Sequence, residues 1–345
     1  MKLAVLFGGS SNEHEVSVVS ACAVIKNLDK KKYDITPIYL DRKDEFYIWR
    51  EDVNNIEPME IGILPTSLEK INEPFLVFKD FDCVFIMIHG KNGEDGILAS
   101  IFEFLHIPYV GNKPAPSMIT MDKIYTKDIL ELNHIKTSKY QSFMKYNNTY
   151  IYNGDSCSFD EVLKHILDKL SFPMFVKPAN SGSSIGVGKA NDLKELEKAI
   201  KEALEIDERI LVEEMVVGRE VECAILERDG KVEASVVGEV LASDEFYSFD
   251  AKYKNSESKT VIPADISEED SVRIREIAIK AFQILNLHGY SRIDFFLTSD
   301  HQAILNEINT IPGFTEISMY PKLWEATGVS YSDLLDTLIV ENIKK

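Results

Sequence analysis

The chain has 345 residues, of which 45% are hydrophobic and 28% charged, a composition typical of a globular protein with two or three domains. Asp and Glu outnumber Lys and Arg by 57 to 38, and the formal net charge is −19. A surface of that charge repels nucleic acid and anionic membranes, so we expect neither as a partner. A phosphate-bearing ligand would need a site built from a few local cations.

Sequence features that report on location point to the cytoplasm. No apolar run is long enough to span a membrane. The apolar start, residues 1–7, is short and lacks the basic region of a secretory signal. Neither metal-ligand nor redox spacing separates the four cysteines, which are Cys22, Cys83, Cys157 and Cys223. We therefore expect free thiols in a reducing, cytoplasmic compartment.

The first third of the chain alternates buried strands with helices. Strands are predicted at 2–7, 34–40 and 82–88, and helices at 13–28 and 94–106. This alternation predicts an α/β fold with a parallel sheet. Two prolines, Pro114 and Pro116, mark a boundary, so we expect a first domain over residues 1–115.

The remaining elements mix strands and helices. The family resemblance given below implies that they form two further units, 116–217 and 218–345, of α+β character. We expect 147–158 to be a polar loop and 243–263 to be a functional lid or a linker, the aromatic residues of the latter favouring a lid. The predicted helices are 121–133, 160–170, 192–206, 268–287 and 330–343. The predicted strands are 173–178, 186–189, 209–217, 220–227, 232–240, 290–298 and 302–309.

A Gly/Ser loop joins two of these strands, from Lys177 to Gly186 (KPANSGSSIG). Glycines let the backbone approach a ligand closely, and successive N–H groups can form an anion-binding nest. Lys177 adds a positive charge at the end of the preceding strand. The alternative is a simple hairpin turn, since the loop is not a Walker A motif.

Two strands near the C-terminus carry charged residues on one face. Alternate residues of a strand share a face, so Arg292 projects with Asp294, and Glu307 projects with Asn309. The oxygen-bearing side chains of Asp294, Glu307 and Asn309 suit a hard divalent cation such as Mg²⁺. The alternative is a structural ion pair between Arg292 and Glu307.

Three turns complete the set of candidate sites. Pro312-Gly313 leaves the second of these strands and can present backbone donors to an oxyanion. The turn from Gly8 to Glu15 opens a helix, where anions are favoured, although Glu13 and Glu15 can also be simple complements of the helix dipole. His89 stands among glycines at a strand's carboxyl end, and its alternative role is structural.

Taken together, the motifs resemble those of the D-alanine–D-alanine ligases of the ATP-grasp superfamily, over nearly the whole chain. The signal is specific because the motifs agree jointly in sequence and order. The matching segments are GGSSNEHEVS (8–17), HGKNGEDG (89–96), MDK (121–123), KPANSGSSIGV (177–187), EEMVVGREVE (213–222), FDAKY (249–253), SRIDFF (291–296) and NEINTIPGFTEISMYPKL (306–323).

The resemblance implies an N-terminal α/β domain followed by a two-part ATP-grasp fold that clamps ATP, with two Mg²⁺ (or Mn²⁺) ions. Asp294, Glu307 and Asn309 match the metal ligands. Some relatives carry lysine at the position of Glu214. This difference casts little doubt on the match, because backbone groups largely bind adenine there. The residues that match nucleotide-binding positions are Lys123, Lys177, Ser183, Ser184, Glu213, Glu214, Val216, Glu220, Lys252, Asn306 and Glu307.

The resemblance also implies ligation of two D-alanine molecules through a D-alanyl phosphate for peptidoglycan synthesis, by a homodimer. Matches to catalytic positions are Glu13, Ser183, Tyr253, Arg292, Gly313 and Ser318. Matches to D-alanine-binding positions are Glu13, His89, Lys252, Arg292, Ser318 and Met319. Among these, Glu13, Ser183 and Tyr253 match a hydrogen-bonded triad.

Three alternatives remain. Relatives that use D-lactate generally lack the tyrosine at Tyr253, and those that use D-serine tend to have a basic residue in place of Met319, so both positions favour D-alanine. A catalytically silent ATP-binding module is the alternative from another class, but every matched metal and phosphate position carries a competent residue. Another ATP-grasp ligase would share the lysines and metal ligands without the HEVS start or the FDAKY loop.

Overall fold

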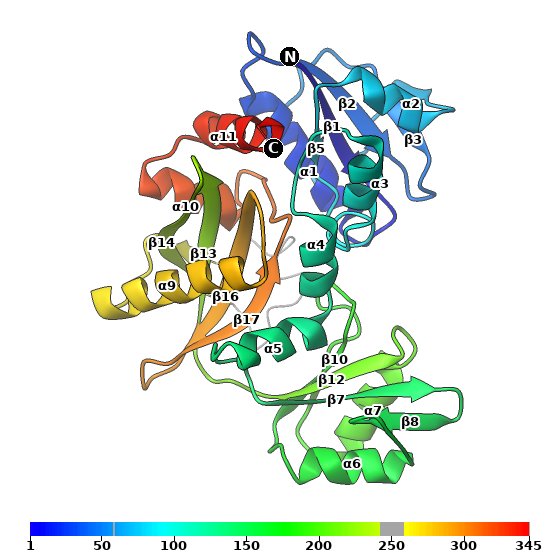
Figure 1. The fold of residues 1–345 in the computed structure, drawn as a ribbon, viewed down its shortest axis with the longest axis vertical. Coiled ribbons are helices and arrows are strands. Elements are labelled where there is room, and N and C mark those ends of the chain that lie inside the picture. The colour runs from blue at the N-terminus through cyan, green and yellow to red at the C-terminus, as the bar shows by residue number, and fades with distance from the viewer. Residues whose placement is uncertain (58, 242–258, 345) are drawn as a thin grey trace.

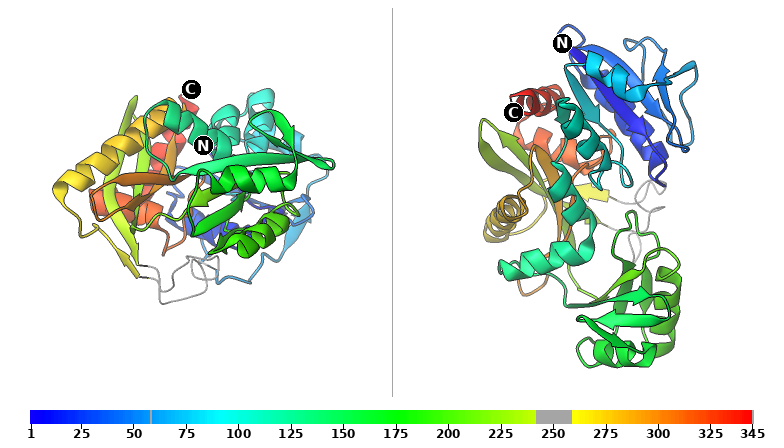
Figure 2. Two further views of the ribbon diagram at one scale, coloured as in Figure 1. Left: turned by 90° about the horizontal axis from the view of Figure 1, so that it is seen from below. Right: turned by 45° about the vertical axis from the view of Figure 1, so that its right-hand side comes forward.

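The computed structural model describes residues 1–57, 59–241 and 259–344. In these residues three β-sheets follow one another along the sequence, each covered by helices (Figure 1). The sheet that contains the N-terminus and the second sheet lie at opposite ends of the molecule, as both views with the long axis upright show (Figure 2). Across this described part of the chain, no helix has the length and apolar character needed to cross a membrane.

The first sheet has the strand order β4-β3-β2-β1-β5-β6. Its strands are β1 (Lys2–Gly8), β2 (Asp34–Leu40), β3 (Phe46–Trp49), β4 (Leu68–Lys70), β5 (Cys83–Ile86) and β6 (Tyr109–Val110). Four neighbouring strands of this sheet, β2, β1, β5 and β6, pair in parallel. This confirms the predicted parallel α/β arrangement. The short strands β3 and β4 extend it antiparallel and were not predicted.

Helices cover both faces of the parallel strands, which explains why β1 is apolar at nearly every position. They are α1 (His14–Asn27), α2 (Pro74–Val77), the 3₁₀ turn η1 (Phe78–Asp80) and α3 (Ile97–Leu105). The C-terminal helix α11 (Tyr331–Ile343) lies beside α1 (Figure 1) and buries Leu334, Leu335 and Leu338 in the same core as Leu3. The two ends of the chain therefore build one hydrophobic core.

The second sheet is antiparallel, in the order β11-β10-β12-β7-β8-β9. Its strands are β7 (Tyr140–Tyr146), β8 (Thr149–Tyr152), β9 (Asp155–Cys157), β10 (Met174–Pro178), β11 (Gly188–Ala190) and β12 (Arg209–Glu214). The helices α6 (Phe159–Leu167) and α7 (Leu193–Ala203) pack against it.

The polar loop predicted over 147–158 is wrong, because this segment forms β8 and β9. Tyr152 pairs with Asp155 around a two-residue turn, Asn153-Gly154, whose residues have φ of 49° and 90°. Asn-Gly is the strongest short-range hairpin signal, because both residues tolerate positive φ. Tyr152 also stacks on His165 of α6 at 4.5 Å between ring centroids, which ties this hairpin to the helix layer.

The third sheet is also antiparallel, in the order β15-β14-β13-β16-β17. Its strands are β13 (Arg219–Arg228), β14 (Lys231–Leu241), β15 (Lys259–Val261), β16 (Tyr290–Leu297) and β17 (Ala303–Asn309). The helices α9 (Glu268–Ile284) and α10 (Met319–Thr327) pack on it, and α4 (Pro114–Met121) and α5 (Lys123–Leu132) connect it to the other two sheets (Figure 1). The prediction of a loop over 243–263 is wrong near its C-terminal end, where Lys259–Val261 forms a strand. Residues 242–258 lie outside the described part of the chain.

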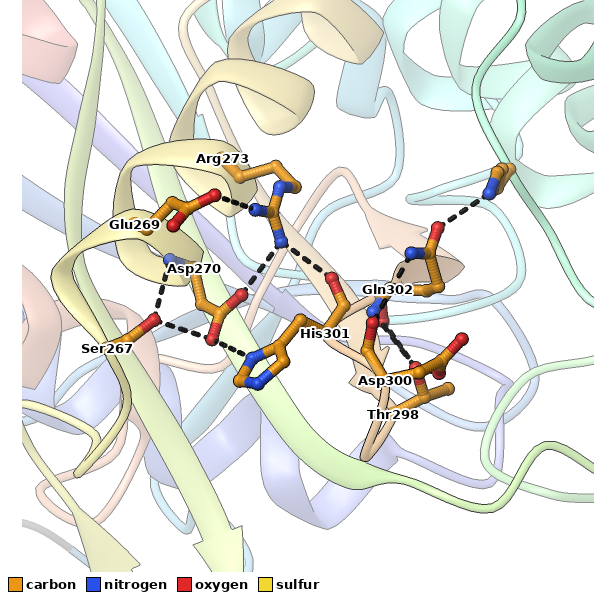
Figure 3. A network of polar contacts seen from close by, with 9 residues as sticks. Ser267, Glu269, Asp270, Arg273, Thr298, Asp300, His301 and Gln302 are labelled. Atoms are coloured by element: carbon orange, nitrogen blue, oxygen red, sulfur yellow. Dashed lines mark hydrogen bonds and ion pairs between the residues drawn. The ribbon is translucent and has the colours of Figure 1, made fainter.

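A polar network fastens the turn between β16 and β17 to the start of α9 (Figure 3). Buried Asp270 accepts hydrogen bonds from Ser267 Oγ at 2.7 Å and Arg273 Nη1 at 2.8 Å, and its Oδ2 lies 2.7 Å from His301 Nδ1. Arg273 Nη1 also donates to the carbonyl of His301 at 2.6 Å. Lys136, after α5, donates to Gln302 at 2.6 Å. The far end of the hairpin that carries Arg292 to Asn309 is therefore held from two sides.

We expect Asp270→Asn to lower the free energy of unfolding by about 1–2 kcal/mol, because it weakens a buried charge-assisted network. The hydrogen bond from Ser267 is the largest cause that lowers the pKa of Asp270, followed by His301. A carboxyl whose pKa is lower in the folded state stabilises the fold above about pH 4 and loses that contribution as the pH falls through its folded pKa. Thermal unfolding at pH 7 and pH 3 should show a smaller wild-type advantage at pH 3.

The control for this variant is Asp300→Asn, because Asp300 belongs to the same turn but is exposed. We expect its unfolding free energy to stay within about 0.5 kcal/mol of wild type. An Asp270 variant as stable as wild type at pH 7 would contradict the anchoring role of this network.

Candidate active site

One cavity of about 500 Å³ opens where the three sheets approach one another, a size common for small-molecule sites. Every predicted site residue in the described part of the chain lines it. They are Glu13, His89, Lys123, Lys177, Ser183, Ser184, Glu213, Glu214, Val216, Glu220, Arg292, Asp294, Asn306, Glu307, Asn309, Gly313, Ser318 and Met319. The other two predicted residues, Lys252 and Tyr253, lie outside the described residues.

The Gly/Ser loop forms one wall of the cavity between β10 and β11. Ser183, Ser184 and Gly186 have φ of 51°, 59° and 71°, so the backbone turns through left-handed conformations of the kind found in anion-binding nests. Lys123, the first residue of α5, donates from its Nζ to the carbonyl of Ser181 and is itself bound through its N–H to Ala179. A candidate anion-binding nest and a lysine thus share this wall.

Beneath this wall, a single carboxylate lies between two lysines. Glu213 Oε2 is 2.5 Å from Lys177 Nζ, and its Oε1 is 2.6 Å from Lys127 Nζ. Ser138 Oγ donates to Glu213 Oε1 at 3.0 Å. The side chains of Glu213 and Lys127 are buried, whereas Lys177 is 19% exposed and reaches the cavity. The sequence indicated Lys177 and Glu213 as neighbours of a nucleotide but not this direct ion pair.

The opposite wall is the β16–β17 hairpin. Pairing places Asp294 directly opposite Glu307 and Arg292 opposite Asn309, while Ile293 enters the core on the other face, as alternation predicted. Arg292 donates to both carboxylate oxygens of Asp294 at 2.7 Å and lies 3.0 Å from Glu222. Burial alone lowers the pKa of Arg292, but the carboxylates of Asp294 and Glu222 raise it well above its ordinary value. The guanidinium therefore stays charged.

The three oxygen-bearing side chains fit a magnesium site that is completed by a ligand. Asn309 Nδ2 donates to Asp294 Oδ2 at 3.1 Å, and Glu307 pairs across from Asp294, so the three residues lie together on the cavity wall. Mg²⁺ in nucleotide sites takes one or two carboxylates from the protein and the remaining oxygens from phosphates and water. Among the residues described, no group of three or more His, Cys, Asp or Glu side chains could hold a metal ion alone.

The Pro-Gly turn after β17 is fixed by His89. His89 Nδ1 is 2.8 Å from the carbonyl of Ile311 and its Nε2 is 3.2 Å from Ser20 Oγ, which also accepts from the N–H of Phe314 at 3.3 Å. Burial lowers the pKa of His89, so the neutral ring donates from Nδ1 to the carbonyl and accepts at Nε2. His89 thereby braces the backbone around Gly313.

The first turn brings Glu13 to the Gly/Ser loop. A Cβ placed on Gly182 would lie 3.6 Å from Glu13 Oε2, and one on Gly90 would lie 3.1 Å from it, so the carboxylate occupies the space that both glycines leave. The Oγ of Ser183 is buried and has no hydrogen-bond partner among the described residues. Glu13 and Ser183 therefore face one region of the cavity.

Three charged residues that line the cavity were not predicted as site residues: Lys127, Glu94 and Glu222. Lys127 follows Lys123 by four positions on one helix, a spacing that places both on one face and could have revealed it. Glu222 lies opposite Asp294 in the sheet, which only strand pairing shows. Burial raises the pKa of Glu94 well above its usual value, with the charge of Glu13 as the next cause.

Comparison with known proteins decides the family. The protein-family profile described as "D-ala D-ala ligase N-terminus" matches residues 2–112, and "D-ala D-ala ligase C-terminus" matches residues 130–340. The chain belongs to the D-alanine–D-alanine ligase family. A D-alanine--D-alanine ligase from Clostridium acetobutylicum is 42% identical over 339 residues, which cover 98% of this chain and 96% of that protein.

Solved structures of the same family share the whole fold. The VanG D-Ala:D-Ser ligase from Enterococcus faecalis is 35% identical with a TM-score of 0.81, and covers 98% of each chain. The D-alanine--D-alanine ligase from Bacillus anthracis complexed with ATP is 30% identical with a TM-score of 0.75, and the match covers 100% of this chain and 97% of that one. The predicted fold class, α/β with an ATP-grasp part, is confirmed.

Proposed function

We propose that this member of the D-alanine–D-alanine ligase family joins two D-alanine molecules at the expense of ATP and so supplies a peptidoglycan precursor. The observation that carries the proposal is the convergence of Lys123, Lys177, Arg292 and the Asp294–Glu307 pair on one cavity in a molecule of net charge −19. The lysines, together with metal ions that Asp294 and Glu307 would hold, would supply local positive charge to a polyanionic ligand.

ATP occupies the part of the cavity between the second and third sheets in this proposal. Its phosphate groups meet the N–H nest of the Gly/Ser loop with Lys123 and Lys177. Adenine and ribose lie toward the segment between β12 and β13, where Glu214, Val216 and Glu220 line the wall. In the same way we propose that Ser184 and Asn306 contact the nucleotide.

Two Mg²⁺ ions, held by Asp294, Glu307 and Asn309, complete the proposed nucleotide site. When bound there, they supply positive charge to the phosphoryl group during its transfer. Asp294 already pairs with Arg292, so the guanidinium lies beside the residues that would hold the metal ions. The count of two ions is part of the proposal.

Residues of the chain have separate roles in the two steps of the proposed reaction. The carboxylate of the first D-alanine is a poor electrophile until it is phosphorylated, and Arg292 orients it for that step. Glu13 binds its ammonium group. When the second amine attacks the D-alanyl phosphate, Arg292 and the N–H of Gly313 stabilise the tetrahedral oxyanion, where one donor contributes about 3–4 kcal/mol. The bracing of the Gly313 turn by His89 supports this role.

We propose D-alanine as the second substrate as well. Met319 begins α10 and Ser318 precedes it, and both line the cavity beside Gly313. Ser318 Oγ accepts from the N–H of Thr315 at 3.0 Å, which fixes its position for a carboxylate. The apolar, buried Met319 offers no charged group to a D-serine hydroxyl. Lys252 and Tyr253 belong to the same proposal from the motif match alone.

We also propose a domain organisation, a cellular location and an oligomeric state for this protein. Each sheet is formed within one of the segments 1–115, 116–217 and 218–345, which supports a division into three domains. The thiols of Cys22, Cys83 and Cys223 are free and buried, which suits the reducing cytoplasm where ATP is made. We also propose a homodimer, on the family resemblance.

Product analysis tests the function. The protein is mixed with ATP, Mg²⁺ and equal concentrations of D-alanine, D-serine and D-lactate at neutral pH, and the products are resolved by mass spectrometry. We expect D-alanyl-D-alanine to dominate, with one ADP released per dipeptide. A mixed dipeptide or depsipeptide as the main product would reassign the second substrate, and ATP hydrolysis that ignores D-alanine would contradict the ligase function.

A further inference from the structure

Lys127 is the most deeply buried cation near the nucleotide end of the cavity. It lies one turn after Lys123 on α5, and its side chain is 4% exposed. Its Nζ contacts Glu213 Oε1 at 2.6 Å, donates to Ser138 Oγ at 2.7 Å and lies 5.3 Å from the centre of the Tyr140 ring. Although Lys127 lines the cavity, its Nζ is engaged by Glu213 and Ser138, so we take its action on a nucleotide to pass through a neighbour.

That neighbour is Glu213, which Lys127 shares with Lys177. One carboxylate oxygen faces each lysine, at 2.6 Å and 2.5 Å. Burial alone raises the pKa of the Glu213 carboxyl, but the two ammonium groups outweigh it and hold the pKa well below its usual range. The carboxylate is therefore ionised at neutral pH. Burial lowers the pKa of Lys127, while the charge of Glu213 raises it. With both lysines protonated, the three groups together carry one net positive charge.

Lys177 is the member of this group of three that exposes positive charge to the cavity. Both lysines line the cavity, but the side chain of Lys177 is 19% exposed, against 4% for Lys127, so Lys177 is the more accessible of the two to a ligand. Without Lys127, Lys177 would be the one described lysine left in contact with Glu213. The Lys177–Glu213 pair would then have no net charge to offer a ligand in the cavity. A buried charge cannot be left unpaired at low cost, so Lys177 would be drawn more firmly to Glu213.

We propose that Lys127 is a positioning residue for nucleotide binding: it neutralises Glu213 and so leaves the charge of Lys177 available to the phosphate groups of ATP. The inference rests on the proposed function in that it takes the nucleotide to be ATP in this cavity. It adds a residue whose influence on the nucleotide passes through Glu213 to Lys177.

The test is direct binding of ATP and of adenosine to Lys127→Met, measured by titration calorimetry without D-alanine. We expect the Kd for ATP to rise by about tenfold, the size of one lost charge-assisted contact. The Kd for adenosine, which has no phosphate, should stay within about twofold. Equal weakening of both ligands would indicate a general structural role and overturn the proposal, as would an unchanged Kd for ATP.

Lys198→Met is the matched control, because it removes the same charge from a side chain on α7 that is 74% exposed and away from the cavity lining. Its Kd for ATP should equal that of wild type. If it weakens ATP binding as much as Lys127→Met does, net charge alone accounts for the effect and the proposal fails.

A double-mutant cycle keeps the proposal testable if Lys127→Met does not fold. Lys127 acts through Glu213, so in a Glu213→Gln background the further change Lys127→Met should leave the Kd for ATP nearly unchanged. A clear additional loss in the double variant would overturn the proposal. Wild-type protein that binds ATP but forms no dipeptide would sink the proposed function and leave the role of Lys127 intact.

Discussion

Glu307→Gln is expected to lower kcat by at least about a thousandfold while the protein remains folded. Glu307 lies opposite Asp294 in the β16–β17 pairing and lines the cavity next to Asn309. An amide of the same shape keeps the packing but removes a negative charge and one anionic metal ligand. The phosphoryl group would then lack charge neutralisation during its transfer. Initial rates of ADP and dipeptide formation measure the loss.

Glu316→Gln is the control for this variant, because Glu316 lies on the turn after the same strand but its side chain is 66% exposed. We expect its rate to match wild type and the melting temperatures of both variants to stay near wild type. A Glu307 variant that turns over at the wild-type rate would remove the metal assignment for Asp294, Glu307 and Asn309 together.

Arg292→Lys should lower kcat by about a hundredfold to a thousandfold, the range seen when one oxyanion donor is lost. Lysine keeps a positive charge beside Asp294 and Glu222, so the buried carboxylates stay neutralised and the fold is retained. It cannot reproduce the two parallel hydrogen bonds of the guanidinium to Asp294 while also facing the substrate. Steady-state kinetics with saturating ATP and D-alanine measure the loss.

Arg219→Lys provides the comparison for Arg292→Lys. Arg219 is on β13 of the same sheet and makes an equivalent forked contact with Glu239, at 2.6 Å for each nitrogen, away from the cavity lining. We expect this variant to keep its kcat. An Arg292 variant within threefold of wild type would show that the guanidinium fork is not needed for the reaction.

Local rules account for much of what the sequence predicted. Strand alternation placed Arg292 and Asp294 on one face and Ile293 on the other, and the structure agrees. The same rules failed at 147–158, where polarity suggested a loop although Asn153-Gly154 is a hairpin signal. They also overlooked the strand at 259–261, which is short and exists by pairing with β14.

Sequence by itself determined the residue types and their order along the chain: a Gly/Ser loop after Lys177, two strands with acids on one face, and a Pro-Gly turn. These depend on backbone periodicity and on motifs only a few residues long. Tertiary structure alone decided that Lys127 and Lys177 share Glu213, and that His89 braces Ile311, 222 residues away. Such contacts depend on which faces of distant elements pack together, and local periodicity carries no information about that choice.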